Sequence, residues 1–235
     1  MSHVSRIEVP GIFHLVERRV RHDLRFPFEF HDRYLALATL HASLYKHGIQ
    51  LCGYNIMSDR VLLVVIPRHP HDISLALMNA DHNLVRRFNE IHHRVAPFWE
   101  GPYNACPFAD EVAGQVLRYV DLATARTDSI GPFDPCALNS AAEHAGVLSR
   151  GLLSAHVERI PSPPGWRAFL TSPEDERFVA ALELCLRTGK PFGPFVFVRR
   201  VEEACGRRVR SVCLRWAGLF DGRHEVPGDG LQPVG

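Results

Sequence analysis

Histidines are the residues of this chain with the clearest capacity for metal chemistry, and their spacing limits it. The chain contains 14 histidines. Two histidines placed two apart on a strand point to one face and can hold a divalent ion between them. His69 and His71 have that spacing, but Pro70 separates them in a segment beyond the preceding apolar run. His92 and His93 are adjacent on a predicted helix, where neighbouring side chains diverge by about 100°. Neither pair is expected to chelate a metal.

Arginines provide a second chemical signal, because a planar guanidinium grips a phosphate without a metal. Between residues 187 and 215 eight basic residues accompany two acidic ones, a local charge of +6 in a chain of net charge +1. Such an excess suits a polyanion such as DNA, and a solvated helix face explains it equally well. Aromatic residues beside arginines suit stacking on unpaired bases. The candidate DNA-binding residues are Arg18, Arg19, Arg60, Arg86, Arg87, Arg94, Trp99, Arg207, Arg208 and Arg210.

Two of these candidates have an alternative interpretation. Arg60 could hold a DNA phosphate, but the favoured interpretation is that it caps a strand next to Asp59 and is solvated. Trp99 could stack on a base, but a tryptophan is more often part of the core.

The cysteines and the hydropathy of the chain exclude several classes of protein. The six cysteines form no Cys-x-x-Cys pair, which argues against a zinc ribbon and a disulfide framework and favours reduced thiols in the cytoplasm. No signal peptide is recognisable at the N-terminus, and no apolar stretch reaches the ~18 residues that a membrane span requires.

Apolar periodicity predicts strands and helices in a recognisable order. The expected elements are a strand over 12–16, a helix over 31–47, strands over 49–57 and 61–66, a helix over 72–93, an irregular edge strand over 98–108 and a helix over 110–126. This order predicts an α+β fold of the ferredoxin-like split βαβ type, with one antiparallel sheet and helices packed on one face.

The expected domain organisation follows from composition along the chain. Its parts are a ferredoxin-type domain over 1–130, a linker and irregular segment over 131–167, a small basic helical C-terminal region over 168–217 and a disordered tail over 218–235.

Five collinear segments resemble one protein family. Residues 54–67, Tyr-Asn-Ile-Met-Ser-Asp-Arg-Val-Leu-Leu-Val-Val-Ile-Pro, are similar to a Tyr-Cys-Leu-Met-Pro-Asn-His-Val-His-Leu-Leu motif. That motif belongs to the REP-associated tyrosine transposases of the HUH single-strand transposase superfamily. Residues 13–18, 86–104, 118–126 and 186–193 resemble further segments of this family in the same order. The agreement in order and spacing extends over about residues 9–215.

The resemblance implies DNA-nicking chemistry with altered ligands. In the family a tyrosine attacks a DNA phosphate, and a divalent metal held by two histidines and a third polar side chain polarises that phosphate. Tyr119 matches the nucleophile, whereas Arg60 and Leu62 stand at the histidine positions and Ala123 at the third ligand position. No metal cofactor is therefore expected. His14 matches a further family position, but a lone strand histidine is more often hydrogen-bonded for structure.

The function expected from the resemblance is that of a transposase-like DNA-binding protein that has lost metal-dependent nicking. The expected partner is single-stranded or hairpin DNA, and a homodimer is compatible with the family. Without a metal, Tyr119 is a phenol with a pKa near ~10 and a poor nucleophile, or simply a core residue. The alternative is an interaction or scaffold protein that keeps the fold without binding nucleic acid. Convergence of the basic residues beside Tyr119 would favour DNA binding.

Overall fold

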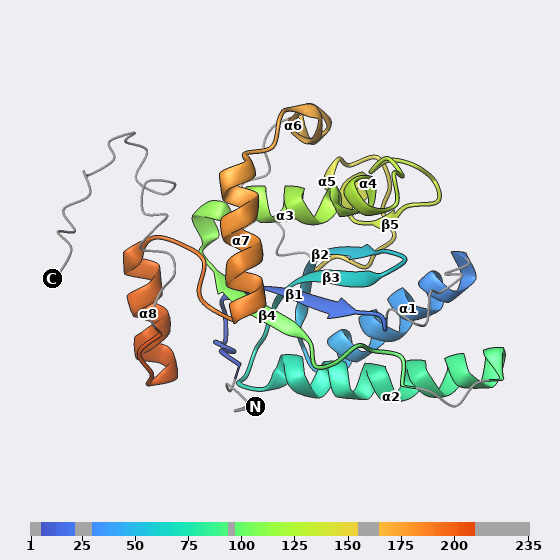
Figure 1. Cartoon of the computed structure of the whole chain (residues 1–235), viewed down its shortest axis with the longest axis horizontal. Coiled ribbons are helices and arrows are strands. Elements are labelled where there is room, and N and C mark those ends of the chain that lie inside the picture. Colours follow the sequence, from blue (N-terminus) through green and yellow to red (C-terminus); the bar gives the residue numbers. More distant parts are fainter. Residues whose placement is uncertain (1–5, 22–29, 94–96, 155–164, 210–235) are drawn as a thin grey trace, which may run out of the picture.

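The computed structural model describes residues 6–21, 30–93, 97–154 and 165–209 (Figure 1). The strands are β1 (Phe13–Arg19), β2 (Gln50–Ile56), β3 (Arg60–Ile66), β4 (Asn104–Phe108) and β5 (Leu138–Asn139). The helices are α1 (Phe30–Lys46), α2 (Asp72–His92), the 3-10 helix η1 (Asp110–Val112), α3 (Ala113–Asp121), α4 (Ala123–Thr127), α5 (Ala141–His144), α6 (Trp166–Thr171), α7 (Glu176–Thr188) and α8 (Phe195–Cys205). Among the helices described, none combines the length and apolar character needed to cross a membrane.

The strands form one antiparallel sheet in the order β4-β1-β3-β2-β5. β2 and β3 form the expected hairpin, in which Ile56 pairs with Val61. The succession β1, α1, β2, β3, α2, β4, α3 is that of the ferredoxin-like split βαβ fold, so the predicted fold class is confirmed.

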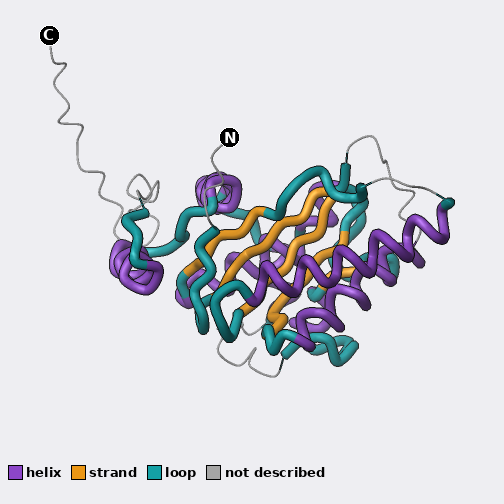
Figure 2. The backbone as a smooth tube through the Cα atoms, turned by 90° about the horizontal axis from the view of Figure 1, so that it is seen from below, coloured by secondary structure: helices purple, strands orange, loops and turns teal. Residues whose placement is uncertain are grey.

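The sheet carries helices on both faces, which corrects the expectation of helices on one face. On β3, Val61, Leu63 and Val65 join the core beneath α1 and α2, whereas Leu62 and Val64 join the core shared with α3 and α7. Figure 1 shows α1 and α2 on one side of the sheet and α3 and α7 on the other, and Figure 2 shows the two long helices lying across the strands. All residues from 61 to 66 are buried, so this strand requires cover on each side.

The segment expected to be a linker contributes to the sheet. Within it, Leu138 and Asn139 of β5 pair with Ile56 and Asn55 of β2. The expected C-terminal region also joins the body of the protein, because Leu182 and other apolar residues of α7 belong to the core beneath α3. Residues 155–164 and the predicted tail over 218–235 lie outside the described residues.

A buried polar cluster fastens α3 and α5 to β2. Asp121, fully buried at the end of α3, accepts hydrogen bonds from Ser140 Oγ at 2.7 Å, Trp166 Nε1 at 2.9 Å and His144 Nδ1 at 2.8 Å. The other ring nitrogen, His144 Nε2, lies 2.8 Å from the carbonyl oxygen of Cys52. Both ring nitrogens therefore meet acceptors, and both carry protons only in the imidazolium. Burial lowers the pKa of His144, but the carboxylate of Asp121 outweighs this effect, so the pKa lies above its ordinary value.

The close approach of α3 to β2 depends on one glycine. β2 carries a register shift between Leu51 and Gly53, and the carbonyl that accepts from His144 belongs to the residue between them. A Cβ at Gly53 would lie 2.6 Å from the Cδ2 atom of Leu117 on α3, which is closer than carbon atoms pack. A larger residue would therefore force the Leu117 side chain, or the helix that carries it, to shift.

His144→Gln is predicted to remove a pH-dependent part of the stability. A histidine with a raised pKa in the folded state stabilises that state below its unfolded pKa of about 6.5. This contribution disappears as the pH rises through the raised value. In denaturant unfolding at about pH 6, the variant should lose about 3–5 kcal/mol, because Asp121 is left buried without its partner. The difference between the two proteins should shrink at alkaline pH. A difference that does not change with pH would show that the folded protein holds His144 neutral.

Candidate functional site

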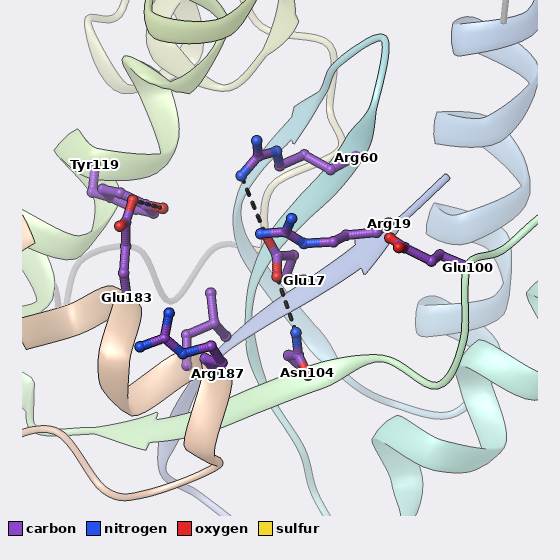
Figure 3. Close-up of a pocket in the computed structure, with 9 residues that line it drawn as sticks. Glu17, Arg19, Arg60, Glu100, Asn104, Tyr119, Glu183 and Arg187 are labelled. Carbon is purple, nitrogen blue, oxygen red and sulfur yellow. Dashed lines mark hydrogen bonds and ion pairs between the residues drawn. The ribbon is translucent and has the colours of Figure 1, made fainter. Parts of the chain in front are cut away.

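A pocket of about 560 Å³ lies between the sheet and the helices α3 and α7 (Figure 3). Its volume is within the range of about 300–1,000 Å³ that is usual for ligand sites. The lining residues are Glu17, Arg19, Arg60, Glu100, Asn104, Tyr119, Glu183, Leu186 and Arg187. The pocket thus brings Tyr119 together with Arg19 and Arg60, three of the residues that the sequence singles out.

Tyr119 enters the pocket from α3 and is almost wholly buried. Its hydroxyl donates to Glu183 Oε1 of α7 at 3.2 Å, and the guanidinium of Arg126 lies 4.5 Å from the centre of its ring. Burial, followed by the negative charge of Glu183, raises the pKa of Tyr119 above its ordinary value. The phenol is therefore held in its neutral form at physiological pH, which makes it a weak nucleophile.

Glu17 is the polar centre of the pocket, and sequence reasoning missed it. Its side chain is only 5% exposed, and it lies on β1, between β4 and β3 in the sheet. Glu17 Oε1 accepts from Arg19 Nη2 at 3.1 Å and from Arg60 Nη1 at 3.4 Å, while Oε2 accepts from Asn104 Nδ2 at 3.1 Å. An acidic residue directly after the apolar stretch 12–16 was the signal in the sequence, because strand alternation places it on the same face as Arg19.

Arg60 is not simply solvated beside Asp59, because it forms ion pairs with two carboxylates. Its Nε and Nη2 atoms donate to the carboxylate of Asp59 at 3.1 and 2.9 Å. Its Nη1 atom reaches Glu17 inside the pocket, and the side chain is 24% exposed. Arg60 is therefore held between a surface carboxylate and a buried one.

The three positions that align with the metal ligands of the resembled family carry no suitable donors. Arg60 and Leu62 lie on one face of β3, but a guanidinium and an isobutyl group are not metal ligands. Ala123, one turn after Tyr119, is buried in the same core as Leu62. Across the residues that the structure describes, no group of three or more His, Cys, Asp or Glu side chains is arranged to hold a metal ion. The residues present thus do not fit the divalent metal that the family uses.

Two candidate DNA-binding residues are engaged in internal contacts on the other face of the sheet. Arg18 forms an ion pair with Asp81 of α2 and lies 4.9 Å from the centre of the Trp99 ring. Trp99 is itself buried in the core beneath α1 and α2. These contacts connect β1 to α2, and they leave little of either side chain for a ligand.

The remaining basic candidates do not gather in one place. Arg86 and Arg87 are exposed on α2, which covers the face opposite the pocket. Arg207 and Arg208 are exposed beyond the end of α8. The other two candidates, Arg94 and Arg210, lie outside the described residues.

A further basic residue joins the pocket from α7. In the sequence Arg187 stands out only as part of the basic segment 187–215, and in the structure it is exposed in the pocket wall. Arg19, Arg60 and Arg187 are thus the arginines that line the pocket together with Tyr119.

The histidines have structural positions where the fold describes them. His14 is fully buried, its Nδ1 donates to the carbonyl of Ile12 at 2.8 Å and its Nε2 accepts from the amide of Val9 at 3.2 Å. Burial lowers the pKa of His14 to about 4, which agrees with a neutral ring that both donates and accepts. The prediction of a hydrogen-bonded structural histidine is confirmed. His69 and His71 lie in the turn between β3 and α2, and His71 has a left-handed backbone with a φ of 71°.

Comparison with solved structures finds a similar fold in a protein of known structure. A REP-associated tyrosine transposase bound to a REP hairpin superposes with a TM-score of 0.50 and 10% sequence identity. The match covers 66% of this chain and 89% of the transposase. No family model and no curated protein matches the sequence. The likeness supports, at the level of the fold, the relationship that the collinear segments predict.

Proposed function

We propose that this chain is a transposase-like protein that binds single-stranded or hairpin DNA and does not nick it by a metal-dependent route. The observation that carries the proposal is the convergence of Arg19, Arg60 and Arg187 around one pocket beside Tyr119. The solved transposase with the same fold is bound to a DNA hairpin. Guanidinium groups bind phosphates of a DNA backbone, and in this pocket three glutamates balance the formal charge of the three arginines.

The proposed loss of nicking rests on two features of the pocket. The donor set at Arg60, Leu62 and Ala123 does not suit a divalent cation. Tyr119 donates to the carboxylate of Glu183, whose negative charge opposes formation of a phenolate. In this proposal the pocket therefore has neither a metal ion to activate a phosphate nor an ionised tyrosine to attack it.

One observation favours the alternative of an interaction or scaffold protein. Arg18 and Trp99 are committed to contacts inside the protein, and Arg86 and Arg87 lie on the face opposite the pocket. Basic residues divided in this way do not form one continuous DNA track. In this alternative the protein would contact another protein or a second copy of itself.

Titration of a fluorescent DNA hairpin with a single-stranded arm separates the two functions. The wild type should bind equally well with magnesium and with a chelator. Arg19→Gln with Arg187→Gln should weaken binding by about tenfold or more, since each hydrogen bond that a charged group no longer makes is worth about 1.5 kcal/mol. The matched control, Arg86→Gln with Arg87→Gln, removes the same charge from the other face and should have little effect. Absence of binding by the wild type would favour the scaffold alternative.

The basic segment after α8 is predicted to add electrostatic affinity. Replacing Arg207, Arg208 and Arg210 by glutamine should flatten the salt dependence of binding. The logarithmic slope should fall by about 0.7 for each phosphate of a single strand that these arginines neutralise in the wild type. The measurement is the same titration repeated over a range of salt concentrations. An unchanged slope would assign these arginines to a solvated surface.

Restoring the ligands is predicted to restore metal binding and covalent chemistry. Wild-type protein titrated with manganese should give no saturable heat. Arg60→His, Leu62→His and Ala123→Asn together should bind manganese, and should then trap labelled hairpin DNA covalently through Tyr119. Burying a histidine in place of Leu62 should cost about 1–3 kcal/mol of stability. A folded variant that binds metal yet traps no DNA would show that a metal alone does not make Tyr119, which still donates to Glu183, a nucleophile.

A further inference from the structure

Glu17 occupies the position in the pocket where basic groups converge. Two guanidinium groups, from Arg19 and Arg60, and the amide of Asn104 donate to its two carboxylate oxygens. Figure 3 shows Glu17 between these donors. Guanidinium groups donate to carboxylate and phosphate oxygens in the same way, so the side chain of Glu17 lies where an anionic ligand would be held.

The charges of the pocket support this view. Its lining contains three arginines and three glutamates, so its formal charge is balanced. Glu183 contacts Tyr119 rather than the Arg19–Arg60 pair. Glu17 is the carboxylate that contacts both of these arginines, and its side chain is almost fully buried.

The contacts allow the arginines to change partners without loss of the fold. Arg60 is anchored to Asp59 through Nε and Nη2, so only its Nη1 atom need leave Glu17. Arg19 is 51% exposed and reaches Glu17 through one nitrogen. A phosphate in the pocket can therefore recruit both guanidinium groups by local rearrangement of their ends.

We propose that Glu17 is an internal competitor for the DNA phosphate. It holds Arg19 and Arg60 when the pocket is empty and is displaced from them when a phosphodiester of single-stranded DNA enters. This inference rests on the proposed function and adds to it a residue that limits affinity. Its consequence is that removal of one buried acidic charge strengthens DNA binding.

The test compares Glu17→Gln with Glu183→Gln in the hairpin titration. Both variants remove one negative charge from the pocket, but only the first releases the Arg19–Arg60 pair. Glu17→Gln should raise affinity on the order of tenfold, the effect of about one hydrogen bond to a charged group. Glu183→Gln should raise it clearly less. Adding Arg60→Gln to the Glu17→Gln protein should abolish the gain, and inorganic phosphate should compete with DNA more effectively for Glu17→Gln than for wild type.

The outcomes separate the inference from the proposed function. Wild-type binding with an unchanged or weakened Glu17→Gln protein overturns the role of Glu17 alone. No binding by the wild type or by any variant overturns the proposed function. Thermal melting checks that each protein is folded. If Glu17→Gln does not fold, Glu17→Asp is the alternative variant, because it shortens the side chain and keeps its charge. The shorter carboxylate lies farther from the two arginines, so DNA affinity should again rise. An unchanged affinity of the Glu17→Asp protein would overturn the inference.

Discussion

The close contact between α3 and β2 is the constraint on which the pocket depends. Tyr119 lies two residues before Asp121, so the cluster that anchors Asp121 also determines where the tyrosine lies. Gly53 permits the approach, and His144 connects the carboxylate to the strand. Asn55 adds a second connection by donating to the carbonyl of Val120 at 2.7 Å. Directional polar contacts in a buried setting define the helix register more strictly than apolar packing does.

Strand alternation then decides which charged residues reach the pocket. Arg18 and Arg19 are adjacent on β1, yet the first contacts Asp81 of α2 and the second contacts Glu17 on the opposite face. Their roles therefore differ although their chemistry is identical. Because successive side chains of a strand point to opposite faces of the sheet, the sequence alone is enough to place these two arginines on different faces. The same rule places Glu17 and Arg19 on one face and explains why the buried acid meets that arginine.

The fold could be predicted from the sequence more fully than the site. Apolar patterns and turn signals identified the strands and helices up to α3. The cover on both faces of the sheet was not predicted, although every residue of the apolar run 61–66 is buried. Glu183 and Arg187 could not be placed, because Tyr119 and Glu183 are 64 residues apart and meet only through the packing of α7. The Asp121–His144 cluster draws on four separate segments, and no local pattern connects them.

Arg60 and Leu62, at the positions that align with the histidines of the resembled family, have opposite consequences for the proposed binding and for nicking. Leu62 is buried in the core, where its side chain contributes about 2 kcal/mol of apolar stabilisation that a histidine without a metal would not supply. Arg60 supplies a permanent positive charge, since a guanidinium stays protonated at any physiological pH. One diffuse charge can attract a phosphate, but it does not polarise the phosphorus as a divalent ion does. The Tyr119 phenol meanwhile faces a carboxylate that disfavours its ionisation. In the proposed function these residues therefore leave a cation that can hold DNA, but they supply neither a metal ion nor an ionised phenol to attack it. Binding and strand cleavage would then be separate properties of this fold.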